Sequence, residues 1–342
     1  MVFSSVLFVF KFLPIALLLL FLTPKKYRNA VLLGLSLVFY AWGEVKYISI
    51  MFASIFIDYF CSNGIEKHRE DRKRTRVYLW ISILMNLGLL FFFKYSDFVI
   101  RSINLLFQSD LPLLNLTLPL GISFYTFQTM SYTFDVYRGN LKAERNIIDF
   151  GAFVCLFPQL IAGPIVTYGQ IAKELKERVV TWAKFNDGVM LFLAGLASKV
   201  LLANNIGMLW DDVLLLGPGR ISTLGAWLGL VAFGMQIYFD FSGYSLMAIG
   251  MGKMMGFEFP QNFNYPYISK SMTEFWSRWH MTLGTWFRDY VYIPLGGNRK
   301  GIKIQLRNLF IVWFLTGLWQ GADYNFVLWG LYFFVLLTLE KL

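Results

Sequence analysis

Apolar residues along this chain gather into long runs, and polar residues fall mainly between them. A helix needs about 20 mostly apolar residues to cross the hydrocarbon core of a bilayer. The pattern predicts spanning helices at residues 6–22, 77–93, 188–202, 224–250, 308–318 and 326–339. The last two runs are short. Residues 30–61 are too long for one span, and the Gly43–Glu44 pair near the middle predicts a hairpin of two short helices.

Three further stretches do not have the pattern of a simple span. Residues 111–135 and 153–165 are apolar but are broken by proline and glycine. Irregular backbone at membrane depth is tolerated where protein buries it or where it lines a cavity. We therefore expect re-entrant or cavity-lining elements in both stretches, with prolines that simply mark loop ends as the alternative.

The third stretch, residues 260–299, mixes aromatic and charged side chains. Phe275, Trp279 and Trp286 recur at helical spacing, while the charges interrupt the segment too often for it to cross lipid. This pattern predicts an amphipathic helix that lies at the membrane interface or dips into a protein cavity.

Composition supports a membrane protein over a soluble one. Of the 342 residues, 57% are hydrophobic and 15% are charged, whereas a soluble domain has roughly 45–50% apolar and about 25% charged residues. Too few polar side chains remain to cover a water-facing surface. The sequence therefore predicts an all-α polytopic protein with a single membrane domain over residues 1–342.

The charge pattern predicts the orientation of the chain. Basic residues are concentrated at 25–28 and at 66–76, and such segments favour the cytoplasmic side. Two crossings between them, and one before them, place the N-terminus outside the cytoplasm. The run at 6–22 lacks a small-residue cleavage site and is interpreted as a retained first helix. Because membrane lipid explains the net charge of +10, no nucleic-acid partner is expected.

Candidate chemistry is sparse. The chain has two histidines, and His68 lies in a basic loop, whereas His280 lies among aromatic residues where a proton-exchanging group is costly to bury. Catalysis and plain hydrogen bonding are equally good interpretations of His280. Nucleotide, zinc-site and serine-nucleophile motifs do not occur, and no metal site is predicted. Lys199, Asp240 and Lys253 inside apolar runs leave a transporter possible.

Several motifs together resemble the membrane-bound O-acyltransferase family, in the bacterial branch that O-acetylates alginate and peptidoglycan. They run in family order across nearly the whole chain, and their ordered sum is specific although each alone is weak. They occupy residues 1–5, 118–127 (LPLGISFYTF), 157–165 (FPQLIAGPI), 238–244 (YFDFSGY), 263–267 (FNYPY), 274–289 and 317–319 (GLW).

The resemblance implies a fold and an activity. We expect a ring of transmembrane helices, with re-entrant and interfacial helices, around a central tunnel in the bacterial inner membrane. A cytoplasmic thioester, acetyl-coenzyme A first among candidates, would donate an acyl group for O-acetylation of an extracellular polysaccharide. No bound cofactor is expected. The partners implied are membrane lipid, the acyl donor and an extracytoplasmic esterase-like acetyltransferase.

The resemblance also implies the site. His280 matches one tunnel-lining histidine of the family, but Gln320 stands where the family has its catalytic histidine. An amide cannot act as the general base, and loss of such a base costs about a hundred- to ten-thousandfold in rate. The substrate-binding candidates are Trp279, Arg288, Asp289, Trp319 and Asp240.

Two features depart from the family pattern. Either an engineered substitution or natural divergence would place Gln320 in its motif, and the intact neighbouring motifs favour engineering. The sequence ends within an apolar run, so we expect that the family's C-terminal helices are lacking. The alternative function is a non-catalytic channel or carrier, in which Asp240, Lys199 and His280 line a polar pathway, or a scaffold in a polymer-export complex.

Overall fold

The computed structural model describes residues 2–217 and 219–342, and all regular structure in these residues is helical. The α-helices are α1 Leu13–Leu22, α2 Arg28–Glu44, α3 Ile48–Lys67, α4 Arg72–Phe107, α5 Ile122–Arg138, α6 Ile147–Cys155, α7 Phe157–Leu160, α8 Tyr168–Lys176, α9 Trp182–Ala197, α10 Asn204–Leu216, α11 Thr223–Met254, α12 Met272–Arg278, α13 Met281–Phe287, α14 Ile302–Gln320 and α15 Tyr324–Leu339. Wider π turns precede α1 (Phe8–Phe12), join α9 to α10 (Ser198–Ala203) and follow α13 (Arg288–Tyr292). The prediction of an all-α protein is confirmed.

Four helical segments are long and apolar enough to cross a membrane: Lys25–Lys67, Arg72–Phe107, Trp182–Leu216 and Thr223–Met254. They contain the predicted runs at 77–93, 188–202 and 224–250. Phe8–Leu22 and Tyr324–Leu339 are shorter apolar helices. Repeated spans of this length make the chain a polytopic membrane protein.

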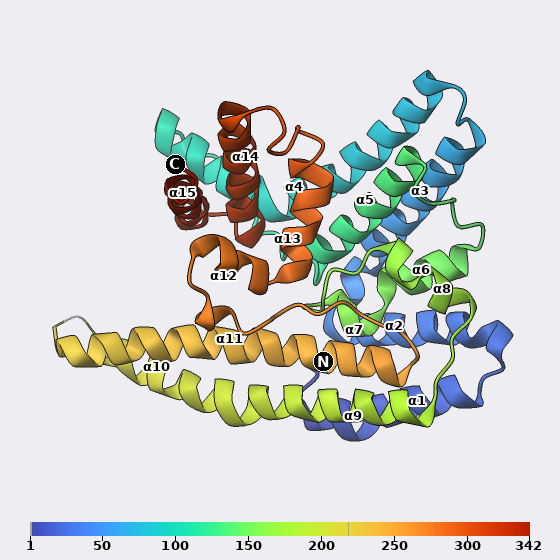
Figure 1. Cartoon of the computed structure of the whole chain (residues 1–342), viewed down its shortest axis with the longest axis horizontal. Helices are drawn as coiled ribbons and strands as arrows, with labels where there is room; N and C mark the ends of the chain where they lie inside the picture. Colours follow the sequence, from blue (N-terminus) through green and yellow to red (C-terminus); the bar gives the residue numbers. More distant parts are fainter. Residues whose placement is uncertain (1, 218) are drawn as a thin grey trace.

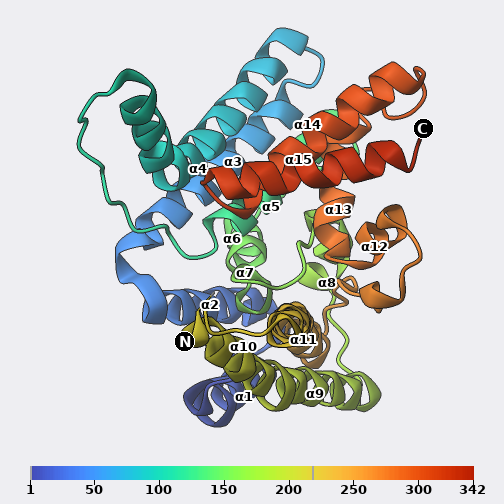
Figure 2. The same ribbon diagram turned by 90° about the vertical axis from the view of Figure 1, so that its left-hand side faces the viewer.

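The helices form two groups with shorter elements between them (Figures 1 and 2). Helices α9, α10 and α11 run along the longest axis with α1 beside them, whereas α14 and α15 lie across that direction. Helices α3, α4 and α5 pack on one another in the second group. The short helices α6, α7 and α8 lie between the groups, and α12 and α13 lie between α11 and α14.

Helices α9 and α11 approach each other closely because small residues face each other at two levels. A Cβ atom added at Gly195 would lie 2.4 Å from the carbonyl oxygen of Gly243. Two helical turns away, a Cβ at Gly250 would lie 2.5 Å from the carbonyl oxygen of Gly188. In lipid, where no hydrophobic effect drives helices together, such backbone contact provides the packing.

The predicted division of residues 30–61 is confirmed, but the predicted hairpin is not. Glu44 has non-helical backbone (φ −154°, ψ 85°) that ends α2, and its side chain accepts a hydrogen bond from the N–H of Leu120 at 3.0 Å. Beyond the break α2 and α3 run in different directions (Figures 1 and 2). The reason is that α3 has polar partners elsewhere, on α4 and α5.

Asp58, in the middle of α3, is the residue that binds those partners on α4 and α5. Its carboxylate is fully buried and accepts hydrogen bonds from Ser82 Oγ, from Asn86 Nδ2 at 2.7 Å and from Thr133 Oγ1 at 3.1 Å. Ser82 and Asn86 belong to α4 and Thr133 to α5, so one carboxylate joins three helices. A buried polar group is tolerated when it is hydrogen-bonded in this way.

The two proline-interrupted stretches are largely buried only from Pro119 onward in the first and throughout the second. Residues 111–118 form a mostly exposed connection, and the chain turns inward at Pro119 to begin α5. Residues 153–165 form the end of α6, the single turn α7 and a buried connection. The stretches meet where Gly121 (φ +73°) faces the carbonyl of Leu160, leaving 2.5 Å for a Cβ atom.

The single amphipathic helix predicted within residues 260–299 is wrong. The segment forms two short helices, α12 and α13, separated at His280, whose φ of +43° is left-handed. An L-residue in that conformation cannot continue a right-handed helix. The helical spacing of the aromatic residues is therefore real within each short helix but does not extend through His280.

The basic segments occupy one end of the molecule. The turn between α1 and α2, which includes Lys25, and the turn between α3 and α4, which includes Asp71, both lie at the right-hand side of Figure 1. This arrangement agrees with two crossings between the basic segments. The side of the membrane on which each end lies stays a prediction.

Candidate active site

The turn at His280 is held by one residue, Asn262. The backbone carbonyl oxygen of Asn262 accepts from the N–H of Met281 at 2.9 Å, and its side-chain Oδ1 accepts from the N–H and the hydroxyl of Thr282 at 3.2 and 2.8 Å. A left-handed L-residue costs about 1–2 kcal/mol, and these three hydrogen bonds offset that cost. His280 is thereby fixed at the first turn of α13.

The same amide oxygen determines which nitrogen of His280 carries a proton. Asn262 Oδ1 lies 3.2 Å from His280 Nδ1. Because this oxygen also accepts from a backbone N–H, it is an acceptor, and Nδ1 must therefore be the donor. Nε2 is then the unprotonated nitrogen, and it has no hydrogen-bond partner in the part of the chain that the structure describes.

His280 is electrically neutral near neutral pH. Its side chain is 3% exposed, and burial lowers the pKa of the imidazole to about 3. A neutral imidazole with an available Nε2 lone pair can accept a hydrogen bond from a hydroxyl group. The turn therefore presents a hydrogen-bond acceptor in an apolar setting.

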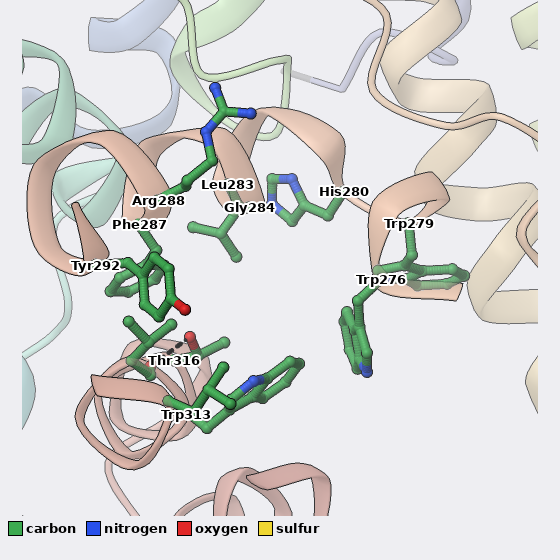
Figure 3. Close-up of a pocket in the computed structure, with 12 residues that line it drawn as sticks. Trp276, Trp279, His280, Leu283, Gly284, Phe287, Arg288, Tyr292, Trp313 and Thr316 are labelled. Atoms are coloured by element: carbon green, nitrogen blue, oxygen red, sulfur yellow. Dashed lines mark hydrogen bonds between the residues drawn. The ribbon is translucent and has the colours of Figure 1, made fainter. Parts of the chain in front are cut away.

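A cavity of about 200 Å³ adjoins this histidine (Figure 3). It is enclosed by α12 and α13 on one side and by α14 on the other, and its wall is almost wholly apolar apart from His280, Arg288, Tyr292 and Thr316. Figure 3 shows the guanidinium of Arg288 turned away from the space that His280 adjoins. The central tunnel that the sequence resemblance implies is not tested by this cavity and stays a prediction.

Aromatic rings pack around the imidazole. Phe241 of α11 meets it edge to face with ring centroids 4.8 Å apart, and Trp319 of α14 lies 5.7 Å away. Trp279 instead packs on Phe263, at 5.1 Å. Of the two tryptophans predicted from sequence, Trp319 thus packs near the imidazole, whereas Trp279 lines the adjoining cavity.

A lysine that sequence reasoning missed lies behind Trp319. Lys94 of α4 donates a hydrogen bond from Nζ to the carbonyl oxygen of Trp319 and another to Ser123 Oγ at 3.3 Å. It holds the last turn of α14 against α4. The available signal was a single cation following the apolar run 77–93. Asn262 was also missed, and no sequence pattern distinguishes it from other asparagines.

Gln320 lies at the end of α14, next to Trp319, and its side chain is exposed. It does not line the cavity beside His280. The two backbone carbonyls just before it bind α4, since Leu318 O accepts from Tyr95 Oη at 2.8 Å and Trp319 O accepts from Lys94. The position is thus well fixed even though the side chain is not enclosed.

Arg288 and Asp289 form a pair with each other at 2.7 Å in the π turn after α13. Asp289 lines a second cavity of about 310 Å³ on the other side of α13, together with Thr282 and Gln170. Of the predicted residues, Trp279, His280 and Arg288 therefore line the first cavity and Asp289 lines the second, and α13 is a wall of both.

Asp240 lies apart from both cavities. Its carboxylate pairs with Lys199 Nζ at 2.8 Å, which joins α11 to the π turn between α9 and α10. Neither residue lines the cavity beside His280. The three groups of the carrier hypothesis are therefore not gathered along one cavity wall.

Comparisons with known proteins decide the family. Residues 141–342 match the MBOAT, membrane-bound O-acyltransferase family. Over its whole length the chain is 43% identical to a probable alginate O-acetylase of Pseudomonas putida, covering 71% of that protein. This chain is a membrane-bound O-acyltransferase family member. The similarity expected from its motifs is confirmed.

Other relatives extend the comparison within the family. The chain is 44% identical over its full length to a probable alginate O-acetylase of Pseudomonas aeruginosa, of which it spans 66%. It is 35% identical to a peptidoglycan O-acetyltransferase of Helicobacter pylori, of which it spans 70%. The chain thus spans about two thirds of the length of the curated relatives it matches.

The part of the chain that matches the family, residues 141–342, contains both walls of the His280 cavity, because it includes α12, α13 and α14. In the described residues no group of three or more His, Cys, Asp or Glu side chains is placed to hold a metal ion. The polar chemistry that this site offers is that of His280 and of the donors and acceptors near it.

Proposed function

We propose that the chain is a membrane O-acyltransferase that moves an acetyl group from a cytoplasmic thioester, acetyl-coenzyme A, toward a hydroxyl of an extracellular polysaccharide. Family membership and the O-acetylase names of its relatives support the reaction class. The observation that carries the proposal is His280, a buried neutral imidazole that lines an apolar cavity and whose Nε2 has no hydrogen-bond partner among the described residues.

The reaction requires a base and a means of holding the attacking group. The acceptor hydroxyl loses its proton as its oxygen bonds to the thioester carbonyl carbon, and the C–S bond then breaks to release the thiol, which takes up a proton. His280 Nε2 accepts a hydrogen bond from the hydroxyl and orients it. We propose that a histidine at position 320, where the family pattern has one, would take the proton.

Gln320 leaves this chain without that base. An amide keeps hydrogen-bonding capacity but does not take a proton near neutral pH. Donor binding is therefore preserved while transfer is slow, by about a hundred- to ten-thousandfold. We further propose that an extracytoplasmic esterase-like acetyltransferase receives the acetyl group, and that the protein binds no cofactor.

The test compares the purified chain with its Gln320→His variant. Each protein is incubated with radiolabelled acetyl-coenzyme A and a soluble polysaccharide acceptor, and thioester loss and labelled product are followed. We expect turnover from the histidine variant only, with similar donor binding by both. A third protein, carrying Gln320→His and His280→Ala, serves as the control and should lose most of the restored turnover.

Three outcomes would count against the proposal. Absence of donor binding by either protein would contradict the reaction class and favour the carrier or scaffold. Restored turnover that is insensitive to His280→Ala would remove His280 from the mechanism. Equal turnover with and without the Gln320→His change would show that position 320 does not supply the base.

A further inference from the structure

A cationic pocket lies far from His280, at the end of the molecule where α1 turns into α2. It has a volume of about 620 Å³, within the range of small-molecule sites. Its polar wall is formed by Lys25, Arg28 and Arg178, and its apolar wall by Phe21, Trp182 and Phe185. Three positive charges therefore face one apolar surface.

The charges of this pocket have no carboxylate partner. In the part of the chain that the structure describes, no acidic group lies within 4 Å of Lys25, Arg28 or Arg178 in an ion pair. Burial and the neighbouring Arg28 lower the pKa of Arg178 to about 10, with Asp149 acting in the opposite direction, so the Arg178 guanidinium remains charged at neutral pH. Adjacent cations that are partly removed from water gain from a bound anion.

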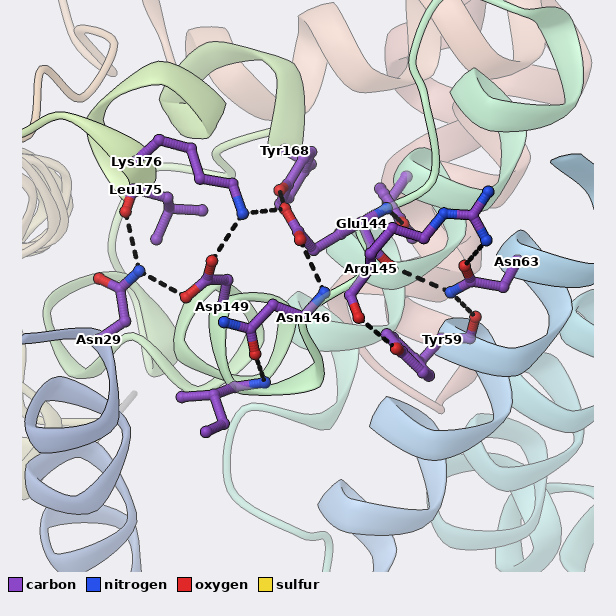
Figure 4. Close-up of polar contacts among 12 residues, drawn as sticks. Asn29, Tyr59, Asn63, Glu144, Arg145, Asn146, Asp149, Tyr168, Leu175 and Lys176 are labelled. Atoms are coloured by element: carbon purple, nitrogen blue, oxygen red, sulfur yellow. Dashed lines mark hydrogen bonds and ion pairs between the residues drawn. The ribbon is translucent and has the colours of Figure 1, made fainter. Parts of the chain in front are cut away.

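The nearest acids are already occupied (Figure 4). Lys176 Nζ pairs with Asp149 at 2.6 Å and with Glu144 at 2.8 Å. The neutral amide of Asn29 stands between this cluster and the pocket, donating to Asp149 Oδ1 at 2.7 Å and accepting from Arg178. Because an amide adds no charge, the positive charge of Arg178 is oriented but not neutralised.

The apolar wall faces outward along two membrane helices. Phe21 of α1 and Trp182 of α9 both pack on Phe185, with ring centroids 5.9 Å apart in each pair. Trp182 is 83% exposed and Phe21 is 41% exposed. Tryptophan at the end of an apolar helix is typical of the level at which lipid headgroups lie.

We propose that this pocket binds the phosphate of an anionic lipid, with Arg28, Arg178 and Lys25 around the headgroup and the acyl chains along α1 and α9. The phosphate supplies the negative charge that the cations lack. The chains cover Phe21 and exposed residues of α1 such as Leu18 and Leu22. A soluble phosphate ester such as coenzyme A shares the phosphate chemistry but would leave this apolar wall uncovered.

The experiment measures lipid binding to the purified chain in detergent micelles by native mass spectrometry. Phosphatidylglycerol is compared with phosphatidylcholine of the same acyl chains, and coenzyme A is titrated separately. Each cation near a headgroup contributes about fivefold to affinity. We expect the Arg28→Gln, Arg178→Gln double variant to bind phosphatidylglycerol about 25-fold more weakly, with phosphatidylcholine binding unchanged.

The matched control is the Arg299→Gln, Lys300→Gln double variant, which removes the same charge from an exposed turn. Its affinity should stay close to that of the parent. If the Arg28 and Arg178 variant does not fold, Lys25→Gln decides, since Lys25 is exposed and should cost about fivefold. Equal binding of the two lipids, equal effects of test and control variants, or loss of coenzyme A binding with phosphatidylglycerol binding intact would each overturn the proposal.

Discussion

Replacing Asn262 with alanine tests the architecture of the site at its most constrained point. The side chain accepts hydrogen bonds from His280 Nδ1 and from the N–H and hydroxyl of Thr282. A net contribution of about 1 kcal/mol for each bond gives about 3 kcal/mol. Losing these hydrogen bonds removes all the support that the Asn262 side chain gives to the left-handed backbone of His280.

The matched control is Asn264→Ala, because Asn264 lies two residues away and only its backbone groups form hydrogen bonds within the described residues. Free energies of unfolding are measured in mixed micelles with increasing sodium dodecyl sulfate. We expect Asn262→Ala to lower the value by about 3 kcal/mol and Asn264→Ala to change it by less than about 0.5 kcal/mol.

A second readout separates the histidine from general stability. The chain has only two histidines, so nitrogen NMR of labelled imidazoles can resolve His280 from His68. The parent should show a protonated Nδ1 at His280, and the Asn262 variant should lose that preference. Equal stability of the two alanine variants, or a protonated Nε2 in the parent, would refute the assignment of the hydrogen bonds.

Other predictions address packing, the buried carboxylate and pH. Gly250→Ala should separate α9 from α11 at Gly188 and destabilise the protein by about 1–3 kcal/mol, whereas Gly88→Ala, which has open space, should be neutral or stabilising; unfolding titrations compare them. Asp58→Ala should cost about 3 kcal/mol or more, because it leaves three buried donors on α4 and α5 without their acceptor and each costs about 1–3 kcal/mol; an unchanged unfolding midpoint would contradict this. Since His280 has a folded pKa of about 3 and an unfolded pKa of about 6.5, only the unfolded state gains its proton as pH falls, so stability is complete above about pH 6.5 and declines below it. Between pH 7 and pH 5 the parent should lose about 2 kcal/mol more than His280→Gln, and parallel pH profiles of the two proteins would show that His280 is not buried in its neutral form.

The sequence alone determined the class of the protein. Long apolar runs with few charges can be satisfied only as helices in lipid, because every backbone polar group must then bond within its own segment. The break at Glu44 and the burial of residues 153–165 also followed from the residues. These properties depend on local composition and on the solvent.

Only the tertiary structure decided the geometry around His280. Aromatic spacing in residues 260–299 predicted one helix, but Asn262, 18 residues earlier, captures the N–H groups that a continuous helix would use. The same contacts select the tautomer of His280. A sequence pattern registers neighbours within a few residues, and these hydrogen bonds connect residues that come together only after folding.

The distribution of charge shows the same division. The sequence showed the basic residues at 25–28 as a signal of topology, but it did not show whether they form ion pairs. In the structure Arg178 lies beside Arg28, and the nearby carboxylates of Glu144 and Asp149 form ion pairs with Lys176. A positively charged pocket therefore remains at one end of the protein. Ion pairing depends on distances of a few ångströms between segments far apart in sequence, and for that reason only the folded chain determines which charges are neutralised.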